Sequence, residues 1–455
     1  MHARNPYRDP PDFQVLAEAY LPLQKHIIAT AKGATIDFKN EGSQRRLTEA
    51  ILHRDFGLKL DLPPDRLCPP VPNRLNYILW LEDIMDAYSL AQPNNPLRVV
   101  RGLDIGTGAS AIYPLLGCST HPNWVFSATE IDDTSMEYAR TNVAANELED
   151  RISVVPADPS GIFFPLAQTD LEYDFTMCNP PFYSSREDVA QSADAKELGP
   201  NAICTGGDME MITPGGETAF VGRMVEESLV LRHKCRWYTS MLGKMSSLAN
   251  IVQTLRENKV DNYAISELVQ GQTKRWLIAW SFGEIRLPDA SVSPLYVVGG
   301  ALTIPKRIAR LPYSGIQNLM PPRNTLKQRL PQTANATQLA PVLSATIGST
   351  DGVIVHNPAQ DPSILDMIVS AYENTWSRAA RRKRKEVVQI DPAVLGETRM
   401  TCRIRYEREE AGAHETIVTD YLVLHWVKGI DRGLFESFAS HVERKVVDAL
   451  KNDIH

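Results

Sequence analysis

The chain has 455 residues, with 48 Lys and Arg against 55 Asp and Glu, so its formal net charge is −7. This length predicts two or three domains at about 150 residues each, and a composition with 43% hydrophobic and 23% charged residues excludes global disorder. No uncharged apolar run approaches the ~18–20 residues that span a bilayer, and the N-terminus has no apolar stretch, so we expect no membrane span and no secretory signal.

Six cysteines are too few for a disulfide framework in a chain of this length. They stand singly, at Cys68, Cys118, Cys178, Cys204, Cys235 and Cys402. Because no two of them form a CxxC pair, we expect no metal site, and a reducing compartment fits the pattern. The acidic net charge excludes a protein coated in basic residues, but it leaves room for a local basic groove.

Residues 1–95 are predicted to form a mostly helical N-terminal extension. Apolar residues recur at helical spacing in Thr48–Phe56, and Asn76–Leu90 is a clear amphipathic helix. The Pro-rich segment Leu62–Pro72 separates the two.

Residues 96–282 alternate between predicted strands and helices. The expected strands are 98–105, 125–130, 152–155, 173–178, 236–242, 260–268 and 276–282. The expected helices begin near residues 112, 133, 219 and 248, and residues 184–215 are predicted to form a long loop. This alternation indicates an α/β domain with a doubly wound, mostly parallel sheet covered on both faces.

The remaining chain is predicted to hold a linker and a smaller domain. Residues 283–343 are Pro-rich and basic, which favours a linker with room for short strands. Residues 344–455 indicate an α+β domain, with helices at 364–376 and 435–450 and strands at 400–406 and 416–427. Six of the eight residues from Arg378 to Lys385 are basic. That run is typical of a nuclear import signal, an RNA contact or a solvated helix face.

A glycine-rich turn follows the first strand of the α/β domain. It reads Asp104-Ile-Gly106-Thr-Gly108-Ala-Ser110, and Glu130 ends the next strand. Glycines allow a sharp turn and close approach to a ligand, and the acidic residue suits ribose hydroxyls. The pattern fits a dinucleotide or S-adenosylmethionine. Because the third glycine of the pyrophosphate-binding fingerprint is missing, we favour S-adenosylmethionine.

The fourth strand ends on Asn179-Pro180-Pro181-Phe182, which is the candidate catalytic motif. The prolines restrict the backbone, so that the Asn179 side-chain oxygen and the Pro180 carbonyl can both be held rigidly. These two acceptors suit the hydrogens of an exocyclic amine on a nucleobase, and Phe182 can stack on a base that is unpaired or flipped. Catalysis would then consist mainly of positioning, without a dedicated general base.

Nine stretches together make the chain similar to the methyltransferase-like protein 16 family of eukaryotic RNA adenine-N6 methyltransferases, which is related to a bacterial ribosomal-RNA adenine methylase. They are MHARN (1–5), PPDF (10–13), DFGL (55–58), RLNYILW (74–80), DIGTGASAIYPLLG (104–117), ATEIDD (128–133), CNPPF (178–182), RWYTSMLGK (236–244) and QGQTKRW (270–276).

The resemblance implies a Rossmann-like class I methyltransferase that forms N6-methyladenosine in U6 spliceosomal RNA. It also implies that the whole Asn179-Pro180-Pro181-Phe182 motif is catalytic in this chain. It also implies that S-adenosylmethionine is bound by Arg74, Gly106, Ser110, Glu130 and Asn179, with Arg74 meeting the methionine carboxylate. Residues 344–455 would correspond to the family's C-terminal RNA-binding module.

Two departures from the family pattern change what we expect of this chain. The loop at residues 156–161 lacks the lysine that can occlude the cofactor site in the family, so occlusion by that side chain is in doubt, and Asp158 is instead expected near the adenine. Pro6 replaces a basic residue, so the N-terminal arm should bind phosphate less strongly.

Basic residues in three regions are the candidate RNA contacts. They are Arg4, Arg8, Lys39, Lys244, Lys274, Arg275, Arg381, Arg382 and Lys383. The resemblance and the basic run favour a nuclear location, with a cytoplasmic pool left open. Two other functions also remain open: a protein glutamine methyltransferase, whose Asn-Pro-Pro-Tyr motif is related, and an RNA-binding scaffold with a vestigial methyltransferase domain.

Overall fold

The computed structural model describes most of the chain. The described residues are 1–31, 33–91, 99–158, 161–164, 171–194, 207–270, 273–289, 297–298, 301–302, 317–330, 336–356, 365–377, 380, 382, 397–410 and 418–452. They divide into two compact units. The first contains residues 1–85, 95–283 and 311–321, and the second contains residues 86–94, 284–310 and 322–455.

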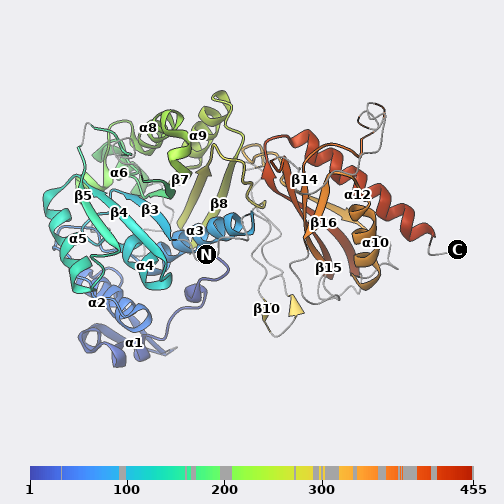
Figure 1. Cartoon of the computed structure of the whole chain (residues 1–455). Helices are drawn as coiled ribbons and strands as arrows, with labels where there is room; N and C mark the ends of the chain where they lie inside the picture. The colour runs from blue at the N-terminus through green and yellow to red at the C-terminus, as the bar shows by residue number, and fades with distance from the viewer. Residues whose placement is uncertain are drawn as a thin grey trace. The chain divides into compact units, whose positions relative to one another are not determined.

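A seven-stranded sheet forms the centre of the first unit (Figure 1). Its order is β5-β4-β3-β6-β7-β9-β8. The strands are β3 (Val100–Ile105), β4 (Trp124–Glu130), β5 (Ile152–Pro156), β6 (Tyr173–Cys178), β7 (Cys235–Leu242), β8 (Tyr263–Gln270) and β9 (Thr273–Trp280). The pairs from β5 through β7 are parallel, whereas β9 is antiparallel to both β7 and β8. The predicted α/β class and all seven strands are confirmed.

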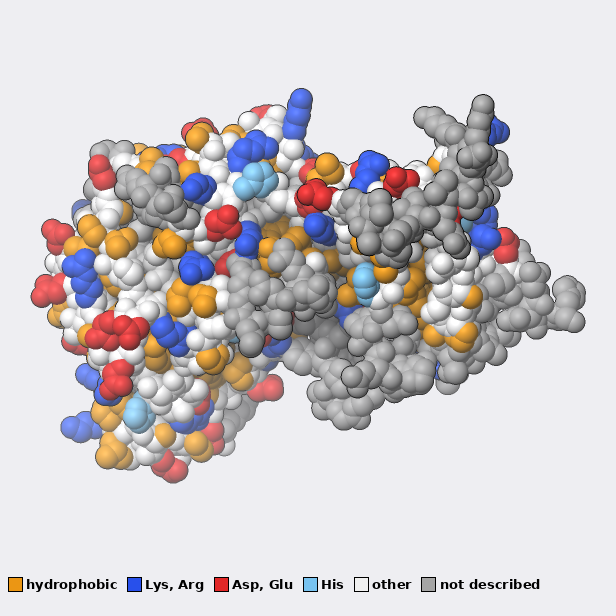
Figure 2. All heavy atoms as spheres, in the orientation of Figure 1, with side chains coloured by type: hydrophobic (Ala, Val, Ile, Leu, Met, Phe, Trp, Pro, Cys, Tyr) orange, Lys and Arg blue, Asp and Glu red, His pale blue; other side chains and the backbone are white. Residues whose placement is uncertain are grey.

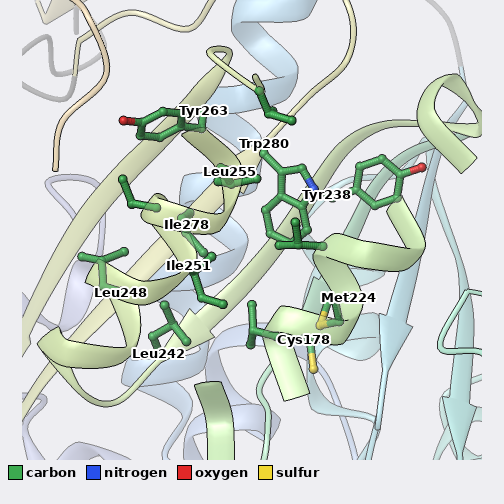
Figure 3. Packing of buried hydrophobic residues seen from close by; sticks show 14 of the residues in the cluster. Cys178, Met224, Tyr238, Leu242, Leu248, Ile251, Leu255, Tyr263, Ile278 and Trp280 are labelled. Carbon is green, nitrogen blue, oxygen red and sulfur yellow. The ribbon is translucent and has the colours of Figure 1, made fainter. Parts of the chain in front are cut away.

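Helices cover this sheet as the alternating pattern predicts. They are α4 (Ile112–Thr120), α5 (Asp133–Ala145), α8 (Gly216–Leu231) and α9 (Met245–Glu257). The first two pack beside β4 and β5, and the last two pack beside β7. In Figure 3, Leu248, Ile251 and Leu255 of α9 lie against Ile278 and Trp280 of β9, and all five side chains are almost completely buried.

The N-terminal extension combines helices with a hairpin that the sequence did not predict. Its elements are η1 (Pro6–Arg8), α1 (Phe13–Ala19), η2 (Leu21–His26), β1 (Ile27–Thr30), β2 (Gly33–Ile36), α2 (Glu41–Ile51), η3 (Leu52–Phe56) and α3 (Val71–Ala91). Asp12 and Asn40 begin α1 and α2 by accepting hydrogen bonds from backbone amides of the first turn. The Met1 amino group donates to the Val269 carbonyl of β8, so the extension is tied to the sheet.

The predicted loop at 184–215 contains two helices among its described residues, α6 (Arg186–Asp194) and α7 (Asp208–Met211). The turn η5 (Arg232–Lys234) then connects α8 to β7.

A five-stranded antiparallel sheet, β12-β16-β15-β14-β13, forms the second unit. The unit comprises β10 (Val297–Val298), β11 (Ala301–Leu302), β12 (Thr325–Arg329), α10 (Ala336–Gly348), β13 (Val353–His356), β14 (Asp366–Ala371), β15 (Met400–Glu410), β16 (Val418–Gly429) and α12 (Arg432–Asn452). Phe435 and Phe438 of α12 are buried in one core with Trp426 of β16, so the predicted α+β character is confirmed.

Two predictions for this region are wrong. The helix expected at 364–376 is strand β14, because a short buried apolar run does not distinguish a strand from a helix by periodicity, and pairing with β13 and β15 decides the outcome. The boundary expected at residue 344 is also wrong, because the segment 283–343, expected to be a linker with short strands, contains β12, which pairs with β16, and the first residues of α10. The second unit therefore begins before residue 344.

We predict that Gly102→Ala destabilises the protein by about 1–3 kcal/mol, the usual cost of overpacking a core. A Cβ at this β3 position would lie 2.7 Å from ring atoms of both Phe126 and Phe175. Urea unfolding followed by circular dichroism measures the change. The matched control is Gly222→Ala in α8, where a Cβ would meet nothing within 4 Å and where helix propensity favours alanine. Equal midpoints for the two variants would contradict the packing described for β3.

Candidate active site

The glycine turn between β3 and α4 is shaped by two left-handed glycines. Gly106 has φ +68° and Gly108 has φ +65°, conformations that side chains other than glycine rarely adopt. A Cβ on Gly106 would have no atom within 4 Å, so open space lies beside the turn. The Thr107 amide donates to the Thr129 carbonyl over 2.9 Å, which holds the turn against the end of β4.

Glu130, at the end of β4, binds the same turn through its carboxylate. Oε2 accepts from the Gly108 amide at 2.8 Å, and Oε1 accepts from the amides of Ile131 and Asp132 at 2.9 and 3.0 Å. A carboxylate offers about four acceptor positions, so three amides leave it capacity for a ligand hydroxyl. Glu130, which the sequence predicts to bind the ribose hydroxyls, therefore also fixes the turn.

Asp104, the last residue but one of β3, has an incompletely satisfied carboxyl group. Its Oδ2 accepts from the Thr107 hydroxyl at 2.7 Å, whereas the buried Oδ1 has no hydrogen-bond partner among the described residues. Burial raises the pKa of Asp104 to about 7, and the nearby Glu130 charge acts in the same direction. A cationic or hydrogen-donating ligand group at this place would favour ionisation.

The other predicted cofactor residues lie around the turn. The Arg74 guanidinium lies 5.6 Å from the Tyr113 ring centroid. Its charge also acts on the nearby Asp104 carboxyl, where it partly opposes the rise in pKa that burial causes. Ser110 is nearly buried, and its hydroxyl accepts from the Ile112 amide at the start of α4. Asp158 follows Ala157, whose amide donates to the Glu130 carbonyl at 2.8 Å, so the chain brings Asp158 to this edge of the sheet.

The candidate catalytic motif begins directly beside the glycine turn. Cys178, the last residue of β6, pairs with Ile105, the last residue of β3. Asn179 follows, and its buried Oδ1 has no hydrogen-bond partner in the described part of the chain. A buried amide oxygen without a donor is costly, and it therefore points to a ligand with an N–H or O–H group.

Tyr77 of α3 holds the residue directly before the motif by hydrogen bonds, a role that the sequence did not predict. Its hydroxyl bonds the Thr239 hydroxyl at 2.7 Å and accepts from the Cys178 amide at 3.4 Å. The only sequence signal is a tyrosine within a long apolar helix, because a buried tyrosine hydroxyl needs a polar partner. Burial raises the pKa of the Cys178 thiol far above its usual value, so this cysteine is neutral.

Phe182 contacts a turn between β7 and α9 that accommodates its ring. A Cβ on Gly243 would lie 2.9 Å from a Phe182 ring atom, so glycine is required there. The buried Glu217 carboxylate fixes this turn by accepting from the amides of Gly243 and Lys244 at 2.5 and 2.8 Å. The sequence did not predict a role for Glu217, and the only signal that could have indicated it is the pair of glycines directly before it.

Arg275 belongs to this site and not to an outer basic surface. Its guanidinium lies 4.8 Å from the Phe182 ring centroid. Burial lowers the pKa of Arg275, with the charge of nearby Arg74 acting in the same direction, while Tyr183 and Glu217 oppose them. Arg275 therefore lies beside the aromatic residue of the candidate catalytic motif, and its phosphate contact stays a prediction.

Two other predicted RNA contacts are engaged within the protein. Arg4 forms ion pairs with Glu82 and Asp83, which attach the N-terminus to α3. Lys244 binds both carboxylate oxygens of Asp188 in α6 at 2.9 and 3.1 Å. These pairs neutralise the charges that were expected to face phosphate.

The remaining basic candidates are spread over the chain. Lys274 lies 3.9 Å from Glu267, whereas Arg8, Lys39 and Arg382 are exposed. Arg381 and Lys383 lie outside the described residues. On the face of the first unit shown in Figure 2, Lys and Arg side chains are interspersed with Asp and Glu. That face therefore presents a mixed-charge surface.

Metal sites and membrane spans are two further features that bear on function. In the described part of the chain, no group of three or more His, Cys, Asp or Glu is placed to hold a metal ion. Among the helices within the described ranges, none has the length and apolar composition needed to cross a membrane.

Comparisons with known proteins place this site in a family. The model of a family described as RNA methyltransferase matches residues 1–284. The U6 small nuclear RNA (adenine-(43)-N(6))-methyltransferase of Schizosaccharomyces pombe is 35% identical over 431 residues, which cover 95% of this chain and 100% of that protein. The RNA N(6)-adenosine-methyltransferase mettl16 of Danio rerio is 36% identical over 402 residues, covering 85% of this chain and 79% of that protein.

Solved human structures match the first part of the chain. The METTL16 catalytic domain in complex with MAT2A 3′UTR hairpin 1 is 42% identical, with a TM-score of 0.57, and the match covers 62% of this chain and 95% of that one. The METTL16 N-terminal domain in complex with SAH is 40% identical, with a TM-score of 0.51, and covers 62% and 98%. The glycine turn, the Asn-Pro-Pro-Phe motif and these matches together show that the chain belongs to the METTL16 family of RNA methyltransferases.

Proposed function

We propose that this chain transfers a methyl group from S-adenosylmethionine to N6 of an adenosine in RNA, with U6 spliceosomal RNA as the substrate. The observation that carries the proposal is the buried Asn179 Oδ1, which has no hydrogen-bond partner among the described residues, at the end of β6 and next to the glycine turn. The relatives named for U6 and for RNA N6-adenosine methylation support the choice of substrate.

The residues around the glycine turn fit S-adenosylmethionine. Its cationic groups suit the carboxylate of Asp104, its ribose hydroxyls suit Glu130, and its own carboxylate suits the guanidinium of Arg74. A dinucleotide would instead bring a pyrophosphate toward two carboxylates, which like charges disfavour. The open space beside Gly106 leaves room for a ligand to approach the backbone.

The protein's contribution to catalysis is positioning. S-adenosylmethionine supplies the activated methyl group when it is bound. Asn179 Oδ1 and the Pro180 carbonyl accept the two amine hydrogens of adenine, which directs the nitrogen lone pair, and Phe182 stacks on the base. Arg275 next to the Phe182 ring adds a cationic plane on which an electron-rich base can stack.

The expected RNA contacts are proposals of the same kind. Arg8, Lys39 and Lys274 can reach phosphate from the first unit, and the second unit would hold the structured part of the RNA. The basic run at residues 378–385 supports nuclear import as well as RNA binding. We therefore propose a nuclear location for the protein.

Replacing Asn179 with alanine should lower methyl transfer about a hundredfold, comparable to removing one preorganised hydrogen-bonding group from an active site. Transfer of labelled methyl groups to a folded U6 RNA fragment, followed by nucleoside analysis for N6-methyladenosine, measures the change. Cofactor and RNA affinities of the variant serve as controls and should change far less. A variant that retains full transfer would exclude Asn179 from the reaction. Label that survives ribonuclease and follows protein would favour a glutamine methyltransferase.

Cofactor affinity should depend on pH through Asp104. The pKa of this carboxyl is raised to about 7, so it is mostly protonated at pH 6 and mostly ionised at pH 8. Because the carboxylate attracts the cationic cofactor, the ratio of wild-type to Asp104→Asn affinity should rise about tenfold between these pH values. Isothermal titration with S-adenosylmethionine gives both affinities, and the variant corrects for titration of the cofactor's own amine. A ratio independent of pH would show that Asp104 does not meet the cofactor.

A further inference from the structure

The chain that follows the catalytic motif returns to it at Tyr183. The Tyr183 amide donates to the Met211 carbonyl at 3.0 Å, and the Thr213 amide donates to the Tyr183 carbonyl at 2.9 Å. Tyr183 and Ile212 thus form an isolated parallel bridge. Because Tyr183 directly follows Phe182, residues 211–213 fix the end of the motif that would stack on the target base.

Glu210, directly before residues 211–213, lies beside the glycine turn. Its Oε2 accepts from the amides of Leu67 and Gly207 at 2.9 and 3.0 Å. Its Oε1 lies 3.9 Å from the place where a Cβ on Gly108 would be. Within the described residues this Oε1 makes no hydrogen bond. One oxygen therefore anchors Glu210 to two backbone segments, and the other is available beside the turn.

The charges around Glu210 indicate what its available oxygen could bind. Burial raises the pKa of Glu210, and the like charge of Glu130 acts in the same direction, while Arg66 opposes them. The Arg66 guanidinium is itself engaged by Asp65 and Asp132. Asp104, just before the same turn, has a buried Oδ1 that no described residue hydrogen-bonds. Like-charged carboxylates beside one ligand site are stabilised by a cation or by several hydrogen-bond donors.

We propose that Glu210 is a positioning residue that couples cofactor binding to placement of the target base, by accepting a hydrogen bond from the cofactor through Oε1 and holding Tyr183 through the bridge at residues 211–213. This inference rests on the proposed function, since it assigns a further residue to the same site. It differs from that function in predicting an energetic coupling between two ligands. Such coupling is reciprocal, so cofactor should tighten RNA binding as much as RNA tightens cofactor binding.

The test compares wild-type protein with Glu210→Gln in two binding measurements. Glutamine keeps an oxygen for the amides of Leu67 and Gly207 but loses the charge. S-adenosylmethionine affinity by calorimetry should fall about tenfold, because the amide nitrogen that replaces Oε1 cannot accept a hydrogen bond from the cofactor. The affinity for a fluorescent U6 fragment should increase on adding S-adenosylhomocysteine to wild type, and this increase should disappear in Glu210→Gln.

Controls separate the coupling from general damage to the fold. Glu226→Gln on α8, an exposed position, should leave both measurements unchanged. The melting temperature of Glu210→Gln, followed by circular dichroism, should match that of the wild type, because the hydrogen bonds from the Leu67 and Gly207 amides are kept. Wild-type cofactor affinity and coupling retained in Glu210→Gln would overturn the inference and leave the proposed function intact. Wild-type protein that binds no S-adenosylmethionine would instead overturn the proposed function.

Discussion

Three backbone amides converge on the carboxylate of Glu130, and the geometry of the site depends on this interaction. The Gly108, Ile131 and Asp132 amides come from two separate loops, one after β3 and one after β4. Their shared acceptor keeps the left-handed glycines in place and leaves open space beside Gly106. Without such a partner the turn would expose amides at a buried edge, where unpaired donors are costly. Ligand binding and loop structure therefore depend on one side chain.

The N-terminal extension contributes residues to the candidate site of the first unit. Helix α3 carries Tyr77 to the start of the catalytic motif and Arg74 to the glycine turn. The Met1 amino group reaches β8, and Arg4 pairs with acidic residues of α3, so the first residues hold this helix in position. The N-terminal extension, which was predicted to bind RNA, thus also positions the candidate catalytic motif.

The local sequence pattern predicted the sheet, the glycine turn and the Asn-Pro-Pro-Phe motif. Buried parallel strands and glycine turns leave strong signals in the sequence. The contacts of Arg275 and Glu217 could not be predicted, since they depend on which distant segments meet at Phe182. The same limit applies to the ion pair of Lys244, since its partner Asp188 lies in a segment that was predicted to be a loop. In the second unit, β14 resembled a helix because burial on both sides removes the alternation of a strand.

The central claim is that two rigid acceptors in the Asn-Pro-Pro-Phe motif receive the exocyclic amine of an unpaired adenine. The most direct measurement is a crystal structure with S-adenosylhomocysteine and an RNA that carries the target adenosine. We predict that adenine N6 lies about 3 Å from both Asn179 Oδ1 and the Pro180 carbonyl oxygen, with the base against the Phe182 ring. An adenine bound with N6 hydrogen-bonded to other groups, and Asn179 still without a partner, would contradict the claim.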